Sequence, residues 1–302
     1  MALYKNISNN LKEIKEKPFK LEKDIQKLFE ANLETIMNLT VVKSEFTIKS
    51  KRIDTLAYDK QNNAFIIIEY KKDKNNSVVD QGFTYLSLML ENKADFIIEY
   101  NETQKQSLKR EEVDWSQTRV VFVSPSFTEN QIQATNFKDI AIELWEVKQY
   151  EDNTVAIAAI KKSNGAESIK PITQNKEVFK KLNEEIKVYT EQEHLSIANE
   201  NIAELYEKFK IAIQNLTDDI QIKPKRREIG FLKSNKIFAD VCIQKKGLKF
   251  WINLKKGKLN DPKKLATDVS NVGHWGNGDY QIQTENSKDL EYIMSLVKQA
   301  II

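Results

Sequence analysis

The sequence has little cysteine and little histidine. One cysteine, Cys242, and two histidines occur in 302 residues. A single cysteine cannot form an intrachain disulfide, so the framework of a small secreted protein is excluded and a reducing, cytoplasmic location is expected. Zinc in proteins is held mainly by cysteine and histidine, so a zinc site is also not expected.

Long hydrophobic runs and a secretory signal are missing as well. The apolar runs at residues 120–123 and 156–160 are far shorter than the roughly 18 residues that a membrane-spanning helix needs. We therefore expect no membrane segment and no membrane partner. The length suffices for two domains, each with its own core.

Positive charge is distributed unevenly along the chain. Between Lys223 and Lys264 there are 14 Lys or Arg residues and three acids, a net charge of +11, whereas the whole chain carries +3. The same stretch contains four interleaved aromatics: Phe231, Phe238, Phe250 and Trp251. Such a pattern is typical of a nucleic-acid-binding surface. The alternative is that the aromatics are strand-core residues and the lysines keep the other face of a sheet soluble.

Two predicted strands carry an acidic and basic cluster. Residues 52–58 and 64–71 flank a short polar turn at residues 59–63, which predicts a hairpin with Asp54 across from the region of Glu69. The pleat places Glu69 and Lys71 on one face. Both faces of the second strand are otherwise apolar, so these charges at its end indicate a function. Two converging carboxylates favour Mg²⁺ or Mn²⁺, and Lys71 suits phosphoryl chemistry.

A third acid is expected from the helix predicted at residues 21–37. Its apolar stripe contains Glu22, whereas Glu30 and Glu34 fall outside it, on the predicted solvent side. We therefore predict that Glu22 reaches the metal site. The alternative is an ordinary first-turn glutamate that is stabilised by the helix dipole.

The helix that follows the second strand adds two polar residues. Gln81 and Tyr85 are four residues apart, so they share a helix face and are predicted to contact DNA phosphates or the leaving group. Tyr85 could instead belong to the core. Three cations flank the same region and would attract a polyanion: Arg52, Lys72 and Lys74.

This order of residues resembles the RecB-type branch of the PD-(D/E)XK nuclease superfamily. The resemblance rests on Asp54, the Glu-x-Lys of Glu69 and Lys71, and the Gln-x-x-x-Tyr of Gln81 and Tyr85. It covers roughly the first 160 residues. The proline that usually precedes the first acid is replaced by Ile53.

The family implies an α/β fold, a mixed sheet flanked by helices. It also implies a metal held by Asp54 and Glu69 with the backbone carbonyl of Tyr70, and it matches Glu22 to the family's helix acid. Glu-x-Lys alone is weak, since it recurs at several positions. The strongest decoy is Glu146 with Lys148, which also ends an apolar strand but lacks the flanking elements.

We expect three parts along the chain: a nuclease-like domain at residues 1–162, a linker and helical connector at 163–219, and a smaller basic α+β domain at 220–302. Further strands of the first domain are predicted at residues 95–99, 119–124, 140–147 and 155–160, with a helix near 129–137. The apolar helical stripes within residues 176–219 would pack on the second domain or on another copy of the protein, as a homodimer contact.

The last part resembles a domain of unknown function that recurs behind such nuclease-like cores and is often described as a predicted transport protein. The resemblance lies in residues 250–254 and 273–280. A Lys-rich domain without a spanning segment cannot move solute through a bilayer by itself. Its predicted nucleic-acid contacts are Lys225, Arg226, Arg227 and Trp275, the last by stacking on a base or, alternatively, as a buried turn residue.

Three functions follow from these patterns. The leading hypothesis is a Mg²⁺- or Mn²⁺-dependent nuclease acting on DNA, with RNA as an alternative substrate, in repair or phage defence. The second is a nucleic-acid-binding protein that does not cleave. The third is a non-catalytic interaction or transport-accessory module, which predicts no metal and no salt-sensitive DNA binding.

Overall fold

The computed structural model describes residues 2–72, 78–137, 139–163, 166–168, 185–186, 189–273 and 276–301. The chain divides into two compact units, Met1–Lys187 (unit 1) and Val188–Ile302 (unit 2). No helix within the described ranges combines the length and hydrophobicity that crossing a membrane requires.

Unit 1 is built on a six-stranded mixed sheet in the order β3-β4-β5-β6-β7-β8. Its strands are β3 (Thr40–Ile48), β4 (Lys51–Asp59), β5 (Ala64–Tyr70), β6 (Arg119–Ser124), β7 (Ile142–Gln149) and β8 (Val155–Ala159). The pairs β5–β6 and β6–β7 are parallel and the others are antiparallel. The hairpin β1 (Leu3–Ile7) and β2 (Asn10–Ile14) forms a separate two-stranded sheet.

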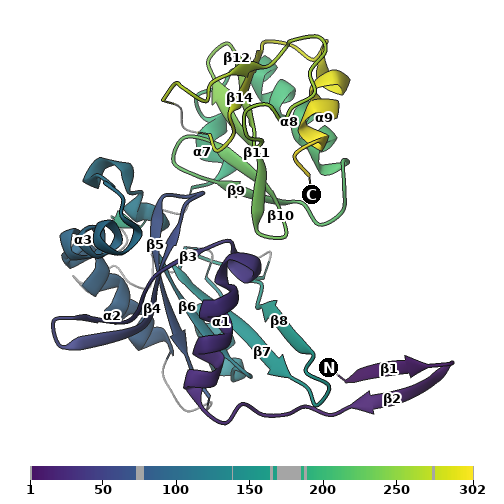
Figure 1. The fold of residues 1–302 in the computed structure, drawn as a ribbon. Coiled ribbons are helices and arrows are strands. Elements are labelled where there is room, and N and C mark those ends of the chain that lie inside the picture. The colour runs from purple at the N-terminus through teal and green to yellow at the C-terminus, as the bar shows by residue number, and fades with distance from the viewer. Residues whose placement is uncertain are drawn as a thin grey trace. The chain divides into compact units, whose positions relative to one another are not determined.

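Helices cover both faces of this sheet (Figure 1). Helix α1 (Glu22–Met37) packs on the face that carries Ile66, Ile68 and the Tyr70 ring. Helices α2 (Val78–Glu91) and α3 (Lys93–Gln104) pack on the opposite face, against Phe65 and Ile67. Since β5 is apolar on both sides, it is fully buried along its whole length. The predicted α/β class, a mixed sheet flanked by helices, is confirmed.

Most predicted elements of unit 1 are present, with one error. The helix near residues 129–137 is α4 (Glu129–Thr135), and short 3₁₀ turns lie at Arg110–Glu112 and Trp115–Gln117. The strand predicted at residues 95–99 is wrong, because this segment belongs to α3. Phe96 and Tyr100, four residues apart, are buried, whereas Ile98 between them is 53% exposed. That spacing buries one face of a helix.

Unit 2 has an antiparallel sheet in the order β13-β14-β12-β11-β10-β9. Its strands are β9 (Gln221–Pro224), β10 (Ile229–Lys233), β11 (Lys236–Gln244), β12 (Gly247–Ile252), β13 (Thr267–Asp268) and β14 (Tyr280–Thr284). Its helices are α7 (Glu191–Leu195), α8 (Glu200–Gln214) and α9 (Leu290–Lys298). This sheet domain with helices confirms the α+β class predicted for the C-terminal part.

Helix α8 belongs to the core of unit 2. This helix lies within the predicted connector at residues 163–219, and of the two predicted packings of its apolar stripe the one on the second domain is observed, with α9 and the sheet. The buried members of the stripe are Ile202, Leu205, Tyr206, Phe209 and Ile213. This stripe is therefore covered by the chain itself and is not free for a second copy. Most of the remaining segment predicted to mediate a homodimer lies outside the described residues.

The four interleaved aromatics of the basic stretch are buried, so the strand-core interpretation is confirmed for them. Beneath the β9–β10 turn lies a buried ionic cluster. The Lys225 ammonium is 2.8 Å from Glu228 Oε1 and 3.0 Å from Asp240 Oδ1. Asn277 donates to Asp240 Oδ2 from its backbone and from its side chain. The cluster therefore connects the turn, β11 and the loop before β14.

We predict that Asp240→Ala lowers the free energy of unfolding of unit 2 by about 3–5 kcal/mol, because it leaves Lys225 with an incomplete set of partners in a buried site. Urea denaturation measures this. The control is Asp268→Ala, which removes the exposed ion pair with Lys256 and should have little effect. A loss below about 1 kcal/mol for Asp240→Ala would contradict the structural role of the cluster.

Candidate active site

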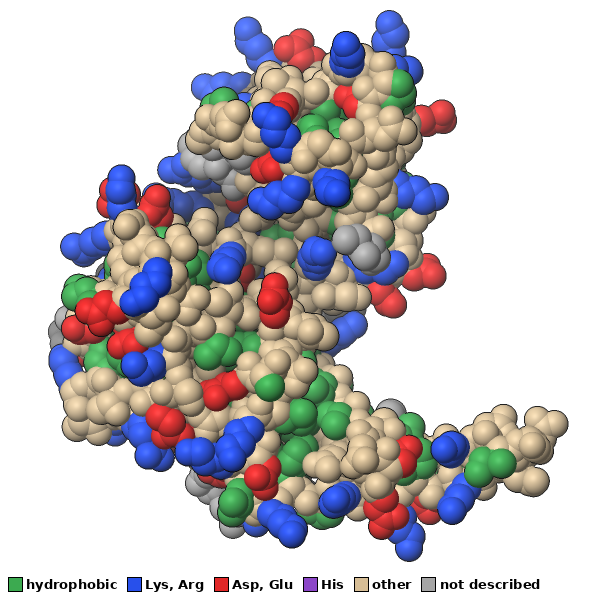
Figure 2. Space-filling model, in the orientation of Figure 1, with side chains coloured by type: hydrophobic (Ala, Val, Ile, Leu, Met, Phe, Trp, Pro, Cys, Tyr) green, Lys and Arg blue, Asp and Glu red, His purple; other side chains and the backbone are tan. Residues whose placement is uncertain are grey.

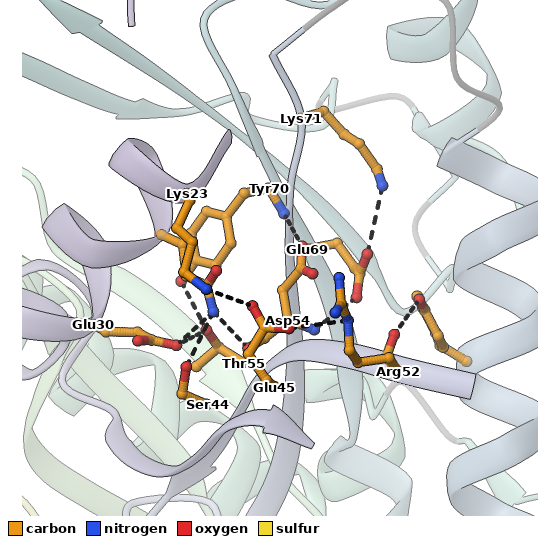
Figure 3. Close-up of polar contacts among 12 residues, drawn as sticks. Lys23, Glu30, Ser44, Glu45, Arg52, Asp54, Thr55, Glu69, Tyr70 and Lys71 are labelled. Carbon is orange, nitrogen blue, oxygen red and sulfur yellow. Dashed lines mark hydrogen bonds and ion pairs between the residues drawn. The ribbon is translucent and has the colours of Figure 1, made fainter. Parts of the chain in front are cut away.

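Two carboxylates stand side by side where β4 and β5 pair. The register Thr55↔Ile68 continues to Asp54 beside Glu69. The Asp54 amide donates to Glu69 Oε1 at 3.1 Å, and the Tyr70 amide donates to Asp54 Oδ2 at 3.0 Å (Figure 3). The predicted hairpin therefore brings both acids together. Glu69 is only 2% exposed and Asp54 is half-buried.

Lys71 adds an ammonium group to this pair. Its Nζ lies 3.5 Å from Glu69 Oε2, and its backbone amide donates to the Val123 carbonyl at 2.8 Å, which fixes the chain just after β5. The Lys71 side chain is 13% exposed. The strand pleat thus places Glu69 and Lys71 on one face, as the alternation predicts.

Helix α2 contributes Gln81 and Tyr85 from the same side of the sheet. Gln81 Nε2 donates to Glu69 Oε2 at 3.1 Å and to the Tyr85 hydroxyl at 3.2 Å. The Tyr85 hydroxyl donates to the Arg52 carbonyl at 3.1 Å. Tyr85 is therefore both a core residue, 5% exposed, and a polar neighbour of the site. A pocket of about 320 Å³ lies beside it, lined by Lys51, Asp80, Gln81, Thr84 and Tyr85.

A polar network lies on the opposite face of the sheet, the face that α1 covers, and contacts both strands. Glu30 Oε1 accepts from the Thr55 hydroxyl at 2.5 Å and from Gln26 Nε2 at 3.1 Å. Gln26 Nε2 also donates to the Asp54 carbonyl at 2.9 Å, and the hydroxyls of Thr55 and Tyr70 share a hydrogen bond of 3.2 Å (Figure 3). The backbone on either side of the carboxylate pair is thereby held from α1.

The prediction that Glu30 faces solvent is wrong. Its carboxylate is partly buried against Thr55, although it lies outside the apolar stripe of α1. The apolar stripe does not reveal this position because Thr55 places a polar side chain on the sheet face that α1 covers, so an acid can pack there. The spacing of Gln26 and Glu30, four apart on one helix face, is the signal that the sequence does offer.

Glu22 lies at the end of β5 rather than among the buried groups. Its Oε1 accepts from the Lys72 amide at 3.0 Å, and its side chain is exposed. The flanking cations are at the surface: Arg52 pairs with Glu45 at 2.9 Å and Lys72 is exposed. Lys74 lies outside the described residues.

The two carboxylates are difficult to ionise together in the absence of a cation. Burial, and next the neighbouring Asp54 carboxylate, raises the pKa of Glu69 to about 7. Burial likewise raises the pKa of Asp54, although the Tyr70 amide and the Lys71 ammonium oppose this. No group of three or more His, Cys, Asp or Glu side chains within the described ranges is arranged to hold a metal ion. The carboxylate set here is thus a pair with a lysine beside it.

The contacts predicted in unit 2 have different outcomes. Lys225 was expected to contact nucleic acid, but it is 4% exposed and ion-paired inside the domain. This expectation is corrected, because a buried and fully paired ammonium cannot reach a phosphate. Arg226 and Arg227 are exposed. Trp275 lies outside the described residues.

Between pH 5 and pH 8, we predict that the free energy of unfolding of the metal-free wild type falls by about 1–3 kcal/mol more than that of Glu69→Gln. The folded state binds the Glu69 proton more tightly than the unfolded chain does, since the pKa rises from 4.5 to about 7 on folding. This advantage is therefore lost as pH rises through 7. Urea unfolding in EDTA measures it. An identical pH dependence in both proteins would show that Glu69 is ionised at neutral pH.

Comparisons with known proteins match a family model to residues within unit 2 and find similar chains. A family model described as Domain of unknown function (DUF5655) matches residues 191–301, within unit 2. Among solved structures, a repair endonuclease from Pyrococcus abyssi is 18% identical, with 43% of this chain and 48% of that chain covered and a TM-score of 0.25. A structure of EndoMS in complex with double-stranded DNA is 19% identical, with 37% and 40% covered and a TM-score of 0.22.

These structural likenesses are partial. This chain spans less than half of either solved chain, and both TM-scores are too low to establish a fold or an activity. A full-length relative exists in Haemophilus influenzae. That protein, described as "Uncharacterized protein", is 54% identical over 301 residues, with 100% of this chain and 99% of that one covered. The chain therefore belongs to the same protein family as this Haemophilus influenzae protein.

Proposed function

We propose that this protein is a divalent-metal-dependent nuclease that hydrolyses phosphodiester bonds of DNA, with its active site at Asp54, Glu69 and Lys71. The observation that supports this most is the convergence of two buried or half-buried carboxylates and one ammonium at adjoining strand ends. The order of Gln81 and Tyr85 on α2 is the reason to place it in the RecB-type branch. The single cysteine favours action in the cytoplasm.

The donor set fits Mg²⁺ or Mn²⁺. Carboxylate oxygens are the hard ligands that these ions prefer. Burial raises the pKa of both Asp54 and Glu69, and the Asp54 carboxylate raises the pKa of Glu69 further; a bound cation would stabilise both groups in their charged form. We propose that Asp54 and Glu69 hold the ion, with the backbone carbonyl of Tyr70 and the Glu22 carboxylate as further ligands. A bound divalent ion polarises the phosphodiester and lowers the pKa of water.

The surrounding side chains have separate roles in this proposal. Lys71 would orient the attacking water and offset negative charge that grows on the phosphate oxygens. Gln81 holds the Glu69 carboxylate by donating to Oε2, the oxygen that also faces Lys71. Tyr85 keeps Gln81 in place and would contact the substrate strand beside the pocket. Arg52 and Lys72, both exposed, would attract the phosphate backbone.

Cleavage of linear, circular and single-stranded DNA should require Mg²⁺ or Mn²⁺, stop in EDTA, and fall at least about a hundredfold in Asp54→Ala and in Lys71→Ala. Gel electrophoresis of the products measures the rate. Lys148→Ala is the matched control, because Lys148 belongs to the other strand-end Glu-x-Lys and pairs with Glu16 at the surface. It should cleave like the wild type.

Other results would favour different functions. DNA that stays intact but shifts in a gel at low salt would support a binding protein without cleavage. RNA cut in preference to DNA would change the substrate. Cleavage that survives in both Asp54→Ala and Lys71→Ala would remove the proposed active site.

The network below the site should affect turnover more than binding. Thr55→Val removes the hydroxyl that donates to Glu30 and should lower kcat about 10- to 100-fold with little change in KM, as for other groups that orient ligands of a metal. Thr55→Ser keeps the hydroxyl and should retain most activity. Steady-state cleavage of a labelled oligonucleotide distinguishes the two variants. Equal kcat in both would show that the hydroxyl has no positioning role.

A further inference from the structure

One end of the sheet in unit 2 gathers two basic turns from different parts of the sequence. Strands β9 to β12 form an antiparallel meander, so the β9–β10 turn and the β11–β12 turn lie at the same end. Ile229, the first residue of β10 after the first turn, pairs with Val241 on β11. The second turn begins after Gln244, three residues further along β11. At about 3.3 Å a residue, the two turns are offset by roughly 10 Å along the strands.

Each turn presents adjacent cations. Arg226 and Arg227 occupy the first turn and Lys245 and Lys246 the second, and all four are exposed. Within the described part of the chain, Arg226, Lys245 and Lys246 have no hydrogen bond or ion pair through their side chains. The first turn is closed by the Lys225 amide donating to the Glu228 carbonyl at 2.8 Å, so its arginines are displayed on a fixed backbone.

The acids nearest these turns offset only part of the positive charge. Glu228 and Asp240 are buried and paired with the Lys225 ammonium. Burial raises the pKa of Glu228, which is opposed by Lys225. Two exposed acids lie near this end: Glu285, directly after β14 and next to Gly247, and Glu193, which precedes His194, whose ring Nε2 is 2.7 Å from the Lys225 carbonyl oxygen. The single Lys225 ammonium offsets one of these two buried carboxylates, and the four exposed cations of the turns still outnumber the remaining acids around them.

The positive charge continues onto the sheet face that faces away from α8 and α9. Phe250, Leu248 and Ile252 point into the core with these helices, so Lys249 and Trp251 lie on the other face. The Lys249 ammonium is 5.9 Å from the centre of the Trp251 ring. The neighbouring positions on this face, Cys242 and Gln281, are half-buried. Lys249 therefore adds a half-buried cation beside the two turns, next to the buried Trp251.

We propose that this end of unit 2, formed by Arg226, Arg227, Lys245 and Lys246 with Lys249 beside them, binds the phosphate backbone of a nucleic acid. Exposed cations spread over about 10 Å on these turns can face several phosphates of a polyanion that carries one charge per strand for every 3.4 Å or so of helix axis. The exposed large hydrophobic side chains of the described chain all lie outside these two turns, which disfavours insertion into a lipid surface. This binding would be independent of whether unit 1 cleaves.

The test is binding of a short labelled DNA duplex and of its single strand by the full-length protein in EDTA, followed by fluorescence anisotropy. Lys and Arg side chains also stand elsewhere on unit 2 (Figure 2), so two variants with equal charge loss are compared. One carries Arg226→Gln, Lys245→Gln and Lys246→Gln. The other carries Lys255→Gln, Lys258→Gln and Lys264→Gln, which are exposed and lie beyond the opposite end of β12.

The first variant should bind DNA at least about tenfold more weakly than the wild type near 0.1 M salt. The steepness of its plot of log K against log salt should fall by about 2–3, since each phosphate contact contributes about 0.9. The second variant should stay within about threefold of the wild type. Equal weakening in both would mean that only net charge matters and would overturn the proposal. So would tighter binding of the wild type to anionic lipid vesicles than to DNA, or no binding to DNA at all. Loss of DNA cleavage with binding intact would affect only the proposed function.

Discussion

The register of the β4–β5 hairpin is the constraint on which the candidate site depends. It sets Asp54 beside Glu69, and each acid is held by a backbone amide of the other strand. A shift of one residue would move either carboxylate to the opposite face. Since β5 is buried on both sides, the chain places an acid with a pKa near 7 inside its core. Such an arrangement is costly to stability and is typical of functional sites.

The two faces of the sheet support this hairpin in different ways. On the α2 side, Gln81 donates to Glu69 and links it to Tyr85. On the α1 side, Glu30 and Thr55 form a network that reaches the Asp54 carbonyl through Gln26. The carboxylate pair is therefore oriented from both layers. In unit 2 the central buried group is a cation instead of an acid. Lys225 is buried between two acids, and the neighbouring Arg226 and Arg227 are exposed.

The sequence predicts what depends on periodicity and misses what depends on contacts between distant elements. Alternation along β5 is enough to place Glu69 and Lys71 on one face, and the short polar turn is enough to bring Asp54 near. The burial of Glu30 depends on Thr55, 25 residues away, and that of Lys225 depends on Asp240 across the sheet. The contiguous apolar run Phe96-Ile97-Ile98 in α3 is typical of a strand, and only the burial of Phe96 and Tyr100, with Ile98 exposed, shows the helical period.

The most direct test of the account is calorimetric titration of the full-length protein with Mn²⁺ near neutral pH. We expect saturable binding by the wild type that is lost in Asp54→Asn and in Glu69→Gln, while the surface variant Lys148→Ala binds normally. These two substitutions remove a ligand's charge with little change in shape. Binding of Mn²⁺ that is unaltered in both variants, or absent from the wild type, would contradict the claim that the Asp54–Glu69 pair is a metal site.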